Sequence, residues 1–195
     1  MKSNKFVTDY FIILEDKNFS RDIGKWAVAD LDKSKNKSAK FRYGKKLKDL
    51  LFYQEKIKRS VFFQLNSASP GFYLPVTIAN PKTGQAITVL AVADSGASSS
   101  CFSHEIAEAI GINWKKGVKS KAFKGEKFTP LYVYQVKILM SLPGDKYFYE
   151  EKVDIINEKR SDNLLGMIGF FNHHQVIFDP KFGIKYKFIT YGGTN

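Results

Sequence analysis

Apolar and polar side chains alternate along residues 72–79, and this alternation predicts a strand with one buried face. Pro75 stands inside the run and has no backbone N–H to donate, so we expect the strand to lie at a sheet edge. Residues 80–84 have the composition of a turn, and residues 87–93 follow as a largely apolar run. Together these segments predict a hairpin whose second strand is buried.

Strand patterns separated by turns continue toward the end of the chain. Residues 119–140 predict a long hairpin with its tip at 124–126, and residues 147–156 predict a further strand. Residues 175–178 and 184–189 lie on either side of a turn and predict a closing hairpin. Short strands separated by glycine and proline turns are typical of all-β proteins that close into a barrel.

Helical patterns are few and short. In residues 103–111, Ser103 is a plausible N-cap, apolar side chains share one face, and Gly111 ends the helix. Residues 169–172 predict a second short helix, and residues 44–59 carry an imperfect helical stripe. We therefore expect an all-β fold with one or two short helices.

The first sixty residues differ from the rest in charge. The chain of 195 residues has a formal net charge of +12, and residues 31–60 hold eleven Lys or Arg against three Asp or Glu, a difference of eight. Such a run either contacts a polyanion weakly or forms a solvated basic surface. Residues 6–14 and 25–31 have strand character. We expect residues 1–60 to form a basic N-terminal extension of uncertain structure and residues 61–195 to form the folded domain.

Cysteine usage and hydropathy bear on location. Cys101 is the only cysteine, which excludes an internal disulfide and fits a reducing compartment. No apolar stretch approaches the roughly 20 residues of a membrane helix, and Asp9 interrupts the apolar residues near the N-terminus. The expectation is a cytoplasmic protein without a membrane partner.

The strongest candidate for chemistry lies at the end of the buried run 87–93. Asp94 follows that run directly and is succeeded by Ser95, Gly96 and Ala97. An Asp that merely caps a turn is the alternative for this position. His173 and His174, with His104 as the one other histidine, do not complete a metal-ligand set. We expect neither a metal nor a cofactor.

The stretch 94–98, preceded by three apolar residues, resembles the Asp-Thr/Ser-Gly-Ala motif of the retropepsin-like aspartic peptidases. The family also carries two apolar residues and a glycine near its C-terminus, and residues 164–166, Leu-Leu-Gly, have that place here. The resemblance covers about residues 61–190 and implies the closed β-barrel of the acid protease fold. The chain departs from many viral members in having Met167 where they have arginine, and in having only Gly125 at the hairpin tip.

The family's reaction needs two carboxylates that share one proton, because two like charges a few ångströms apart cannot both ionise. One carboxylate takes a proton from a water molecule, which attacks the peptide carbonyl, and the other donates a proton to the developing oxyanion. The chain has a single Asp-Ser-Gly motif. The resemblance therefore implies a homodimer in which each subunit contributes Asp94.

The resemblance also assigns supporting roles around the catalytic Asp94. Ser95 would hold the opposing loop, and Gly96 would supply a backbone amide. The full predicted site adds Ala97 to these two, with Phe123, Lys124, Gly125, Leu165 and Gly166 as the flap and substrate-binding residues. The implied function is aspartic endopeptidase acting on polypeptide. The alternative is a catalytically silent dimerisation or peptide-binding module of the same fold, whose basic arm contacts nucleic acid or an acidic partner.

Overall fold

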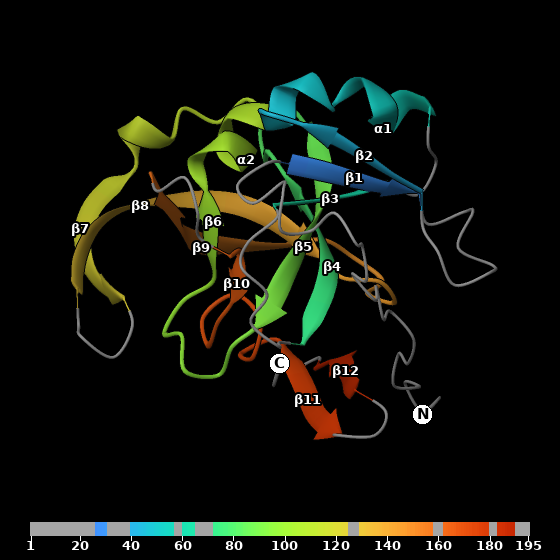
Figure 1. Ribbon diagram of the computed structural model, residues 1–195. Helices are drawn as coiled ribbons and strands as arrows, with labels where there is room; N and C mark the ends of the chain where they lie inside the picture. The colour runs from blue at the N-terminus through green and yellow to red at the C-terminus, as the bar shows by residue number, and fades with distance from the viewer. Residues whose placement is uncertain are drawn as a thin grey trace.

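The computed structural model describes residues 26–30, 40–56, 60–64, 72–124, 129–157, 162–179 and 183–189. Strands dominate these ranges, as Figure 1 shows, and the all-β prediction is confirmed. The strands are β1 (Trp26–Asp30), β2 (Lys40–Gly44), β3 (Ser60–Gln64), β4 (Tyr73–Ala79), β5 (Ala86–Ala93), β6 (Cys101–Ser103), β7 (Val118–Lys124), β8 (Thr129–Ser141), β9 (Tyr149–Ile156), β10 (Leu164–Leu165), β11 (His174–Asp179) and β12 (Gly183–Phe188). Across the described ranges, no helix has the length and apolar character needed to span a membrane.

Six of these strands close into a ring around the main core. The order is β4, β5, β10, β6, β9 and β8, and β8 returns to β4. The fully buried side chains that fill the interior come from many parts of the chain, among them Leu74, Val89, Phe102 and Ile155. Their removal from water is the main stabilising contribution to the fold. The ring also brings the short strand β10 beside the carboxyl end of β5 (Figure 1).

The predicted hairpin of residues 72–93 is formed by β4 and β5, which pair along the whole of β4. The expectation that β4 is an edge strand holds for only part of its length. β4 also pairs with β8, but only from Thr77 to Ala79. Pro75 lies outside that second pairing, opposite Leu90 of β5. This position suits a residue that has no N–H to donate to another strand.

The described part of the first sixty residues continues the same sheet. β3 pairs with β5 in parallel, and β1 lies between β3 and β2, so the strand expected at 25–31 is confirmed. Trp26, Leu47 and Leu50 are buried in the main core, and the Trp26 ring N–H donates to Glu105. The strand expected at 6–14 lies outside the described residues. The division of the chain at residue 60 stays a prediction.

The three helical segments predicted from the sequence differ in how well they agree with the structure. The segment 44–59, which carries the helical stripe, forms only a 3₁₀ turn, η3 (Leu47–Asp49), and a short helix, α1 (Phe52–Lys56). Its first residue, Gly44, belongs to β2. Ser103 does precede helix α2 (His104–Ala109), and Gly111, at φ +72°, follows its end. The helix predicted at 169–172 is wrong. Gly169 has φ +98°, which a right-handed helix cannot accommodate, and the segment forms turns instead.

Two hairpins complete the fold. β7 and β8 pair from Val118 to Gln135 as the long hairpin predicted from residues 119–140, and a 3₁₀ turn, η4 (Trp114–Lys116), leads into it. Its tip, 125–128, lies outside the described residues. β11 and β12 form the predicted closing hairpin as a separate two-stranded sheet, drawn in red at the bottom of Figure 1.

Candidate active site

Asp94 is the first residue after β5, and backbone hydrogen bonds hold the chain on both sides of it. The Asp94 N–H donates to the carbonyl oxygen of Leu165 at 3.0 Å, and the Ala93 N–H donates to Phe72 at 2.8 Å. The carbonyl of Asn163 accepts from the Val92 N–H at 2.8 Å. The end of β5 is therefore fixed between β10 and the start of β4, so the position of Asp94 is set by the sheet.

The turn that follows Asp94 folds back onto its carboxylate. The Gly96 N–H donates to Asp94 Oδ1 at 2.9 Å, and the Ala97 N–H donates to the Asp94 carbonyl at 3.2 Å. Asp94 is half-buried, whereas Ser95 and Gly96 are exposed. A Cβ on Gly96 would lie 3.2 Å from Asp94 Oδ1, so a larger residue would crowd the carboxylate. The turn thus presents one carboxylate, with one of its oxygens bonded to a backbone amide.

Leu165 and Gly166 lie beneath this turn and support it. The Met167 N–H donates to the Ala97 carbonyl at 2.9 Å, and the Ile168 N–H donates to the Ser98 carbonyl at 3.0 Å. A Cβ on Gly166 would stand 2.4 Å from the Ser99 carbonyl oxygen, which leaves room for glycine alone. Both Leu165 and Gly166 are buried. The structure therefore places these two predicted substrate-binding residues behind the loop, and places Leu164 at the cavity described below.

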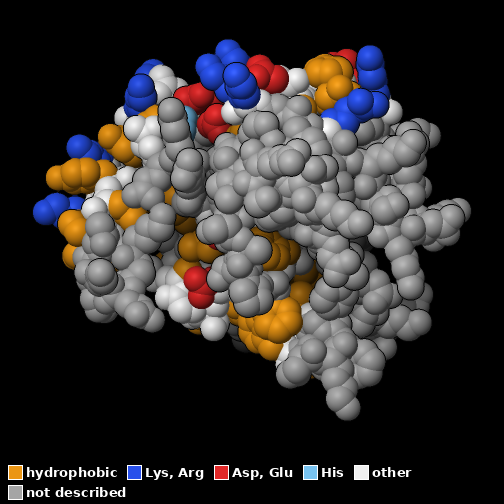
Figure 2. Space-filling view, in the orientation of Figure 1, with side chains coloured by type: hydrophobic (Ala, Val, Ile, Leu, Met, Phe, Trp, Pro, Cys, Tyr) orange, Lys and Arg blue, Asp and Glu red, His pale blue; other side chains and the backbone are white. Residues whose placement is uncertain are grey.

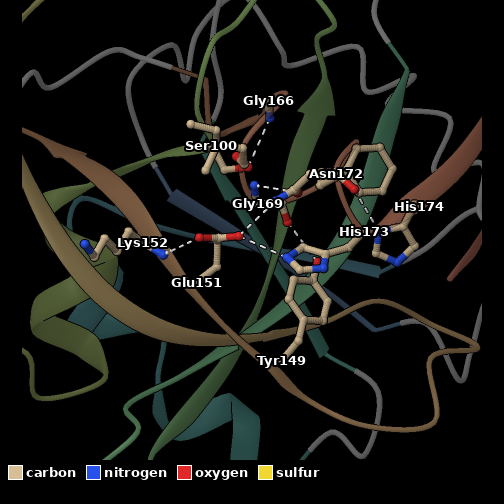
Figure 3. Close-up of polar contacts among 11 residues, drawn as sticks. Ser100, Tyr149, Glu151, Lys152, Gly166, Gly169, Asn172, His173 and His174 are labelled. Carbon is tan, nitrogen blue, oxygen red and sulfur yellow. Dashed lines mark hydrogen bonds and ion pairs between the residues drawn. The ribbon is translucent and has the colours of Figure 1, made fainter. Parts of the chain in front are cut away.

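Ser100 links the two segments and was missed by the sequence reasoning. Its hydroxyl accepts a hydrogen bond from the Gly166 N–H at 3.0 Å and donates to the Ile168 carbonyl at 3.0 Å. Figure 3 shows Ser100 beside Gly166 and Gly169. A Cβ on Gly169 would stand 2.6 Å from the Ser100 hydroxyl oxygen. Since Ser100 ends a run of three serines, no local pattern distinguishes it.

A cavity of about 420 Å³ extends from Asp94 to the β7–β8 hairpin. Of the predicted flap residues, Phe123 lines this cavity, whereas the Lys124 side chain and Gly125 lie outside the described residues. The lining residues are Asp94, Gly96, Ala97, Ser98, Ser99, Cys101, Ala122, Phe123, Leu131, Val133, Asp154, Ile156, Asp162 and Leu164. Asp94, Gly96 and Ala97 of the motif thus face the same cavity as the hairpin. A cleft of this size, with apolar walls and a few polar groups, can hold a ligand side chain or peptide segment.

Two further carboxylates line the cavity, and the sequence reasoning missed both. Asp154, in the middle of β9, accepts a hydrogen bond from the Ser99 hydroxyl on Oδ2. Asp162 precedes β10 and lies near Tyr73, where burial, and then the charge of Asp162, raise the pKa of the tyrosine hydroxyl. Because β9 and the segment before β10 reach the Asp94 loop only through long-range pairing, the sequence pattern does not bring these residues together.

The two adjacent histidines contact carboxylates near the closing hairpin. Glu151 accepts hydrogen bonds from the Lys152 N–H at 2.8 Å and the Asn172 side chain at 3.1 Å, and His173 Nε2 lies 2.9 Å from it (Figure 3). Burial acting alone would raise the pKa of Glu151, but these contacts together lower it below its usual value. In the part of the chain that the structure describes, no group of three His, Cys, Asp or Glu could hold a metal ion.

No family model matches the chain, and no curated protein matches it. The solved structures that are similar to it in fold include the following three. The EIAV protease complexed with the inhibitor HBY-793 is 11% identical, and the match covers 51% of this chain and 85% of that one with a TM-score of 0.38. A retropepsin-like aspartic protease from Rickettsia conorii is 15% identical, with 63% of this chain and 93% of that one covered and a TM-score of 0.46. The retroviral protease-like domain of Ddi1 from Leishmania major is 19% identical, with 65% of this chain and 99% of that one covered and a TM-score of 0.42. Each is a protease or protease-like domain by name. The functional argument below rests on the geometry of this chain.

Proposed function

We propose that the chain is an aspartic endopeptidase whose active site forms between two copies, each contributing Asp94. The observation that carries the proposal is the position of this carboxylate. It stands at the end of a buried strand, on a turn held by backbone hydrogen bonds, and it faces a cavity under a long hairpin. A side chain positioned in this way is pre-organised for chemistry on a bound ligand.

The reaction follows from two such carboxylates sharing one proton. The ionised Asp94 takes a proton from a water molecule held between the pair, and the water oxygen forms a bond to the peptide carbonyl carbon. The protonated Asp94 of the second copy gives its proton to the carbonyl oxygen. The tetrahedral intermediate then collapses. The Asp94 that took the water proton gives it to the nitrogen, the C–N bond breaks and the amine leaves, while a hydroxyl of the intermediate returns its proton to the other Asp94 and becomes part of the new carboxyl group. Every atom transferred comes from water or the two carboxylates, so the step needs no cofactor.

The exposed apolar residues beside the Asp94 loop support a homodimer. Met167 and Ile168, which hydrogen-bond to that loop, are 48% and 49% exposed. Phe178 of β11 is also exposed and lies against Phe72, with ring centroids 5.1 Å apart. A second copy covering this surface would remove apolar area from water and bring the two Asp94 loops together. In this proposal Met167, the departure from the viral pattern, would lie at the contact between the two copies.

The substrate in this proposal is an extended polypeptide that lies between Asp94 and the β7–β8 hairpin. Extended chains bind such clefts through backbone hydrogen bonds, and side-chain pockets set their specificity. Phe123, exposed on β7 and part of the cavity lining, would cover the bound segment. A cytoplasmic location and a weak polyanion contact through residues 31–60 remain part of the proposal, and neither is needed for the chemistry.

The test is turnover of a diverse peptide library by the wild-type chain, by Asp94→Asn and by the control Asp49→Asn, whose carboxylate is exposed on η3. We expect Asp94→Asn to lose activity by about a thousandfold or more, because an amide cannot share the proton. Asp49→Asn should match the wild type. Activity of Asp94→Asn within about tenfold of wild type would refute the Asp94 pair. Absence of turnover by a folded, dimeric wild type would favour the silent binding module instead.

A further inference from the structure

The described lining of the cavity beneath the hairpin is acidic, whereas the chain as a whole is basic. The chain carries a formal net charge of +12, yet among the described residues the charged ones that line the cavity are Asp94, Asp154 and Asp162. Figure 2 shows Lys and Arg side chains along the upper and left outline of this face of the molecule. Since basic residues are abundant elsewhere, an acidic cavity lining is a local property of the site.

The walls around Asp154 are apolar. Leu131 and Val133 of β8, Ile156 of β9 and Leu164 of β10 line the same cavity. Asp154 itself is held between β6 and β8, where its register partners are Cys101 and Gln135. A pocket with apolar walls and one carboxylate suits a side chain that has a methylene stem and a cationic end, because the two parts can be satisfied separately.

One oxygen of Asp154 accepts a hydrogen bond, and the other is buried without one. The Ser99 hydroxyl donates to Oδ2, which fixes the rotation of the carboxylate. Oδ1 is buried and has no hydrogen-bond donor among the described residues. A buried acceptor without a donor is unfavourable, and such groups are uncommon in folded proteins. A bound ligand with an N–H donor would satisfy this oxygen and neutralise the charge.

We propose that this cavity binds the side chain of a lysine or arginine in the polypeptide substrate, with Asp154 as its counter-charge and Ser99 as the residue that orients Asp154. The inference rests on the proposed peptidase function and assigns its specificity. The aliphatic stem packs against Leu131, Val133 and Ile156, and the cationic end donates to Asp154. Asp154 is a specificity residue here, since the proton transfers belong to Asp94.

The experiment uses peptide pairs that are identical except for lysine against norleucine, or arginine against citrulline, placed at each position in turn. Relative kcat/KM is measured for the wild type, and binding of the same pairs is measured with Asp94→Asn. We expect a preference of about tenfold or more for the charged member at one position, the size that one charge-assisted hydrogen bond supports. In Asp154→Asn this preference falls to about one, and in Ser99→Ala it falls in part. Glu150→Gln, which removes an exposed carboxylate of β9 outside the cavity lining, should leave it unchanged.

The outcomes separate the two proposals. Cleavage without any preference for the charged member overturns the specificity inference and leaves the peptidase standing. A folded Asp154→Asn that keeps the full preference also overturns it. If no peptide is cleaved but Asp94→Asn binds the charged members more tightly, the peptidase fails and the basic-side-chain pocket holds. If Asp154→Asn does not fold, the preference of the wild type for the charged peptide is measured between 50 and 500 mM salt. A preference that weakens with salt supports a charge pair, and an absent or salt-independent preference contradicts it.

Discussion

Carboxylates occupy two regions of this molecule, and they differ in how fully their oxygens are hydrogen-bonded. Asp145 and Glu151 lie near the closing hairpin, and Asp94 and Asp154 line the cavity. Both regions are built from long-range contacts between strands and turns. The comparison separates carboxylates that hold the fold together from carboxylates that are available to a ligand.

In the first region the acceptors are satisfied. Asp145 accepts from the Leu142 N–H at 2.8 Å and faces His174 Nε2 at 3.1 Å, with the two side chains 3% and 0% exposed. His174 Nδ1 lies 3.0 Å from the Phe170 carbonyl, so both ring nitrogens face an oxygen acceptor. The Tyr149 hydroxyl donates to the Gly169 carbonyl at 2.9 Å, and burial raises its pKa. These contacts join the 142–145 turn, β9 and β11.

In the second region the acceptors are left partly open. Among the described residues, Asp94 accepts a single hydrogen bond on its side chain, from the Gly96 N–H, and Asp154 accepts one, from the Ser99 hydroxyl. Both line the same cavity. Asp145 and Glu151 face hydrogen-bond partners on both oxygens, whereas Asp94 and Asp154 each keep one oxygen that accepts no hydrogen bond from the described residues. These two oxygens are therefore candidates for contact with a ligand or a reacting water.

The largest effect on stability should come from breaking the buried pair of the first region. Each Asp145 oxygen faces a hydrogen-bond partner, Leu142 N–H or His174 Nε2, and Asp145→Asn turns one of these acceptors into an NH2 group. We therefore expect the free energy of unfolding to fall by about 1–3 kcal/mol, the cost of disrupting a buried hydrogen bond. Asp154→Asn is the matched control, because its amide oxygen can still accept from Ser99, and it should change stability by less than about 1 kcal/mol. Denaturant unfolding of the three proteins makes the measurement. Equal losses in the two variants would show that the two regions do not differ in this way.

A smaller effect is expected at Glu151, where the comparison can be tested by pH. The folded-state pKa of Glu151 lies below its ordinary value of 4.5, so its ionised form is stabilised by folding. That stability is fully present above about pH 4.5 and is lost as the pH falls through the lowered pKa. We expect less than about 1 kcal/mol, because the side chain is partly exposed.

The measurement for Glu151 is the free energy of unfolding between pH 6 and pH 3 for the wild type and Glu151→Gln. The difference between them should shrink as the pH falls, since protonation removes from the wild type what the substitution has already removed. Glu150→Gln is the control variant, because Glu150 forms an ion pair with Lys137 in which both side chains are exposed. A Glu151→Gln difference that stays constant with pH would contradict the assignment.

The comparison also explains which features were predictable from the sequence. The hairpin of β4 and β5 and the position of Asp94 at its end follow from local alternation and from the Ser-Gly turn. The Asp154 carboxylate and its Ser99 donor are 55 residues apart, and only the pairing of β6 with β9 brings them together. Local periodicity predicts which residues are buried, but it does not specify which strands become neighbours.

The errors have similar causes. The helix expected at 169–172 failed because Gly169 adopts a left-handed backbone conformation against Ser100, a contact made across the fold. β4 was expected at an edge because Pro75 lacks an N–H, but β8 reaches the end of β4 beyond that proline. In both positions a tertiary contact determined the local structure, and the local sequence pattern did not predict that contact.

The central claim is that two copies of Asp94 form one site, and mixing subunits tests it most directly. Wild-type chain at fixed concentration is equilibrated with increasing Asp94→Asn chain, and peptide turnover is measured. Because a mixed dimer holds one carboxylate and one amide, the account predicts that a tenfold excess of Asp94→Asn removes about nine-tenths of the activity. Turnover that stays constant through the titration, with exchange of subunits verified, would contradict the account and place both catalytic groups within one chain.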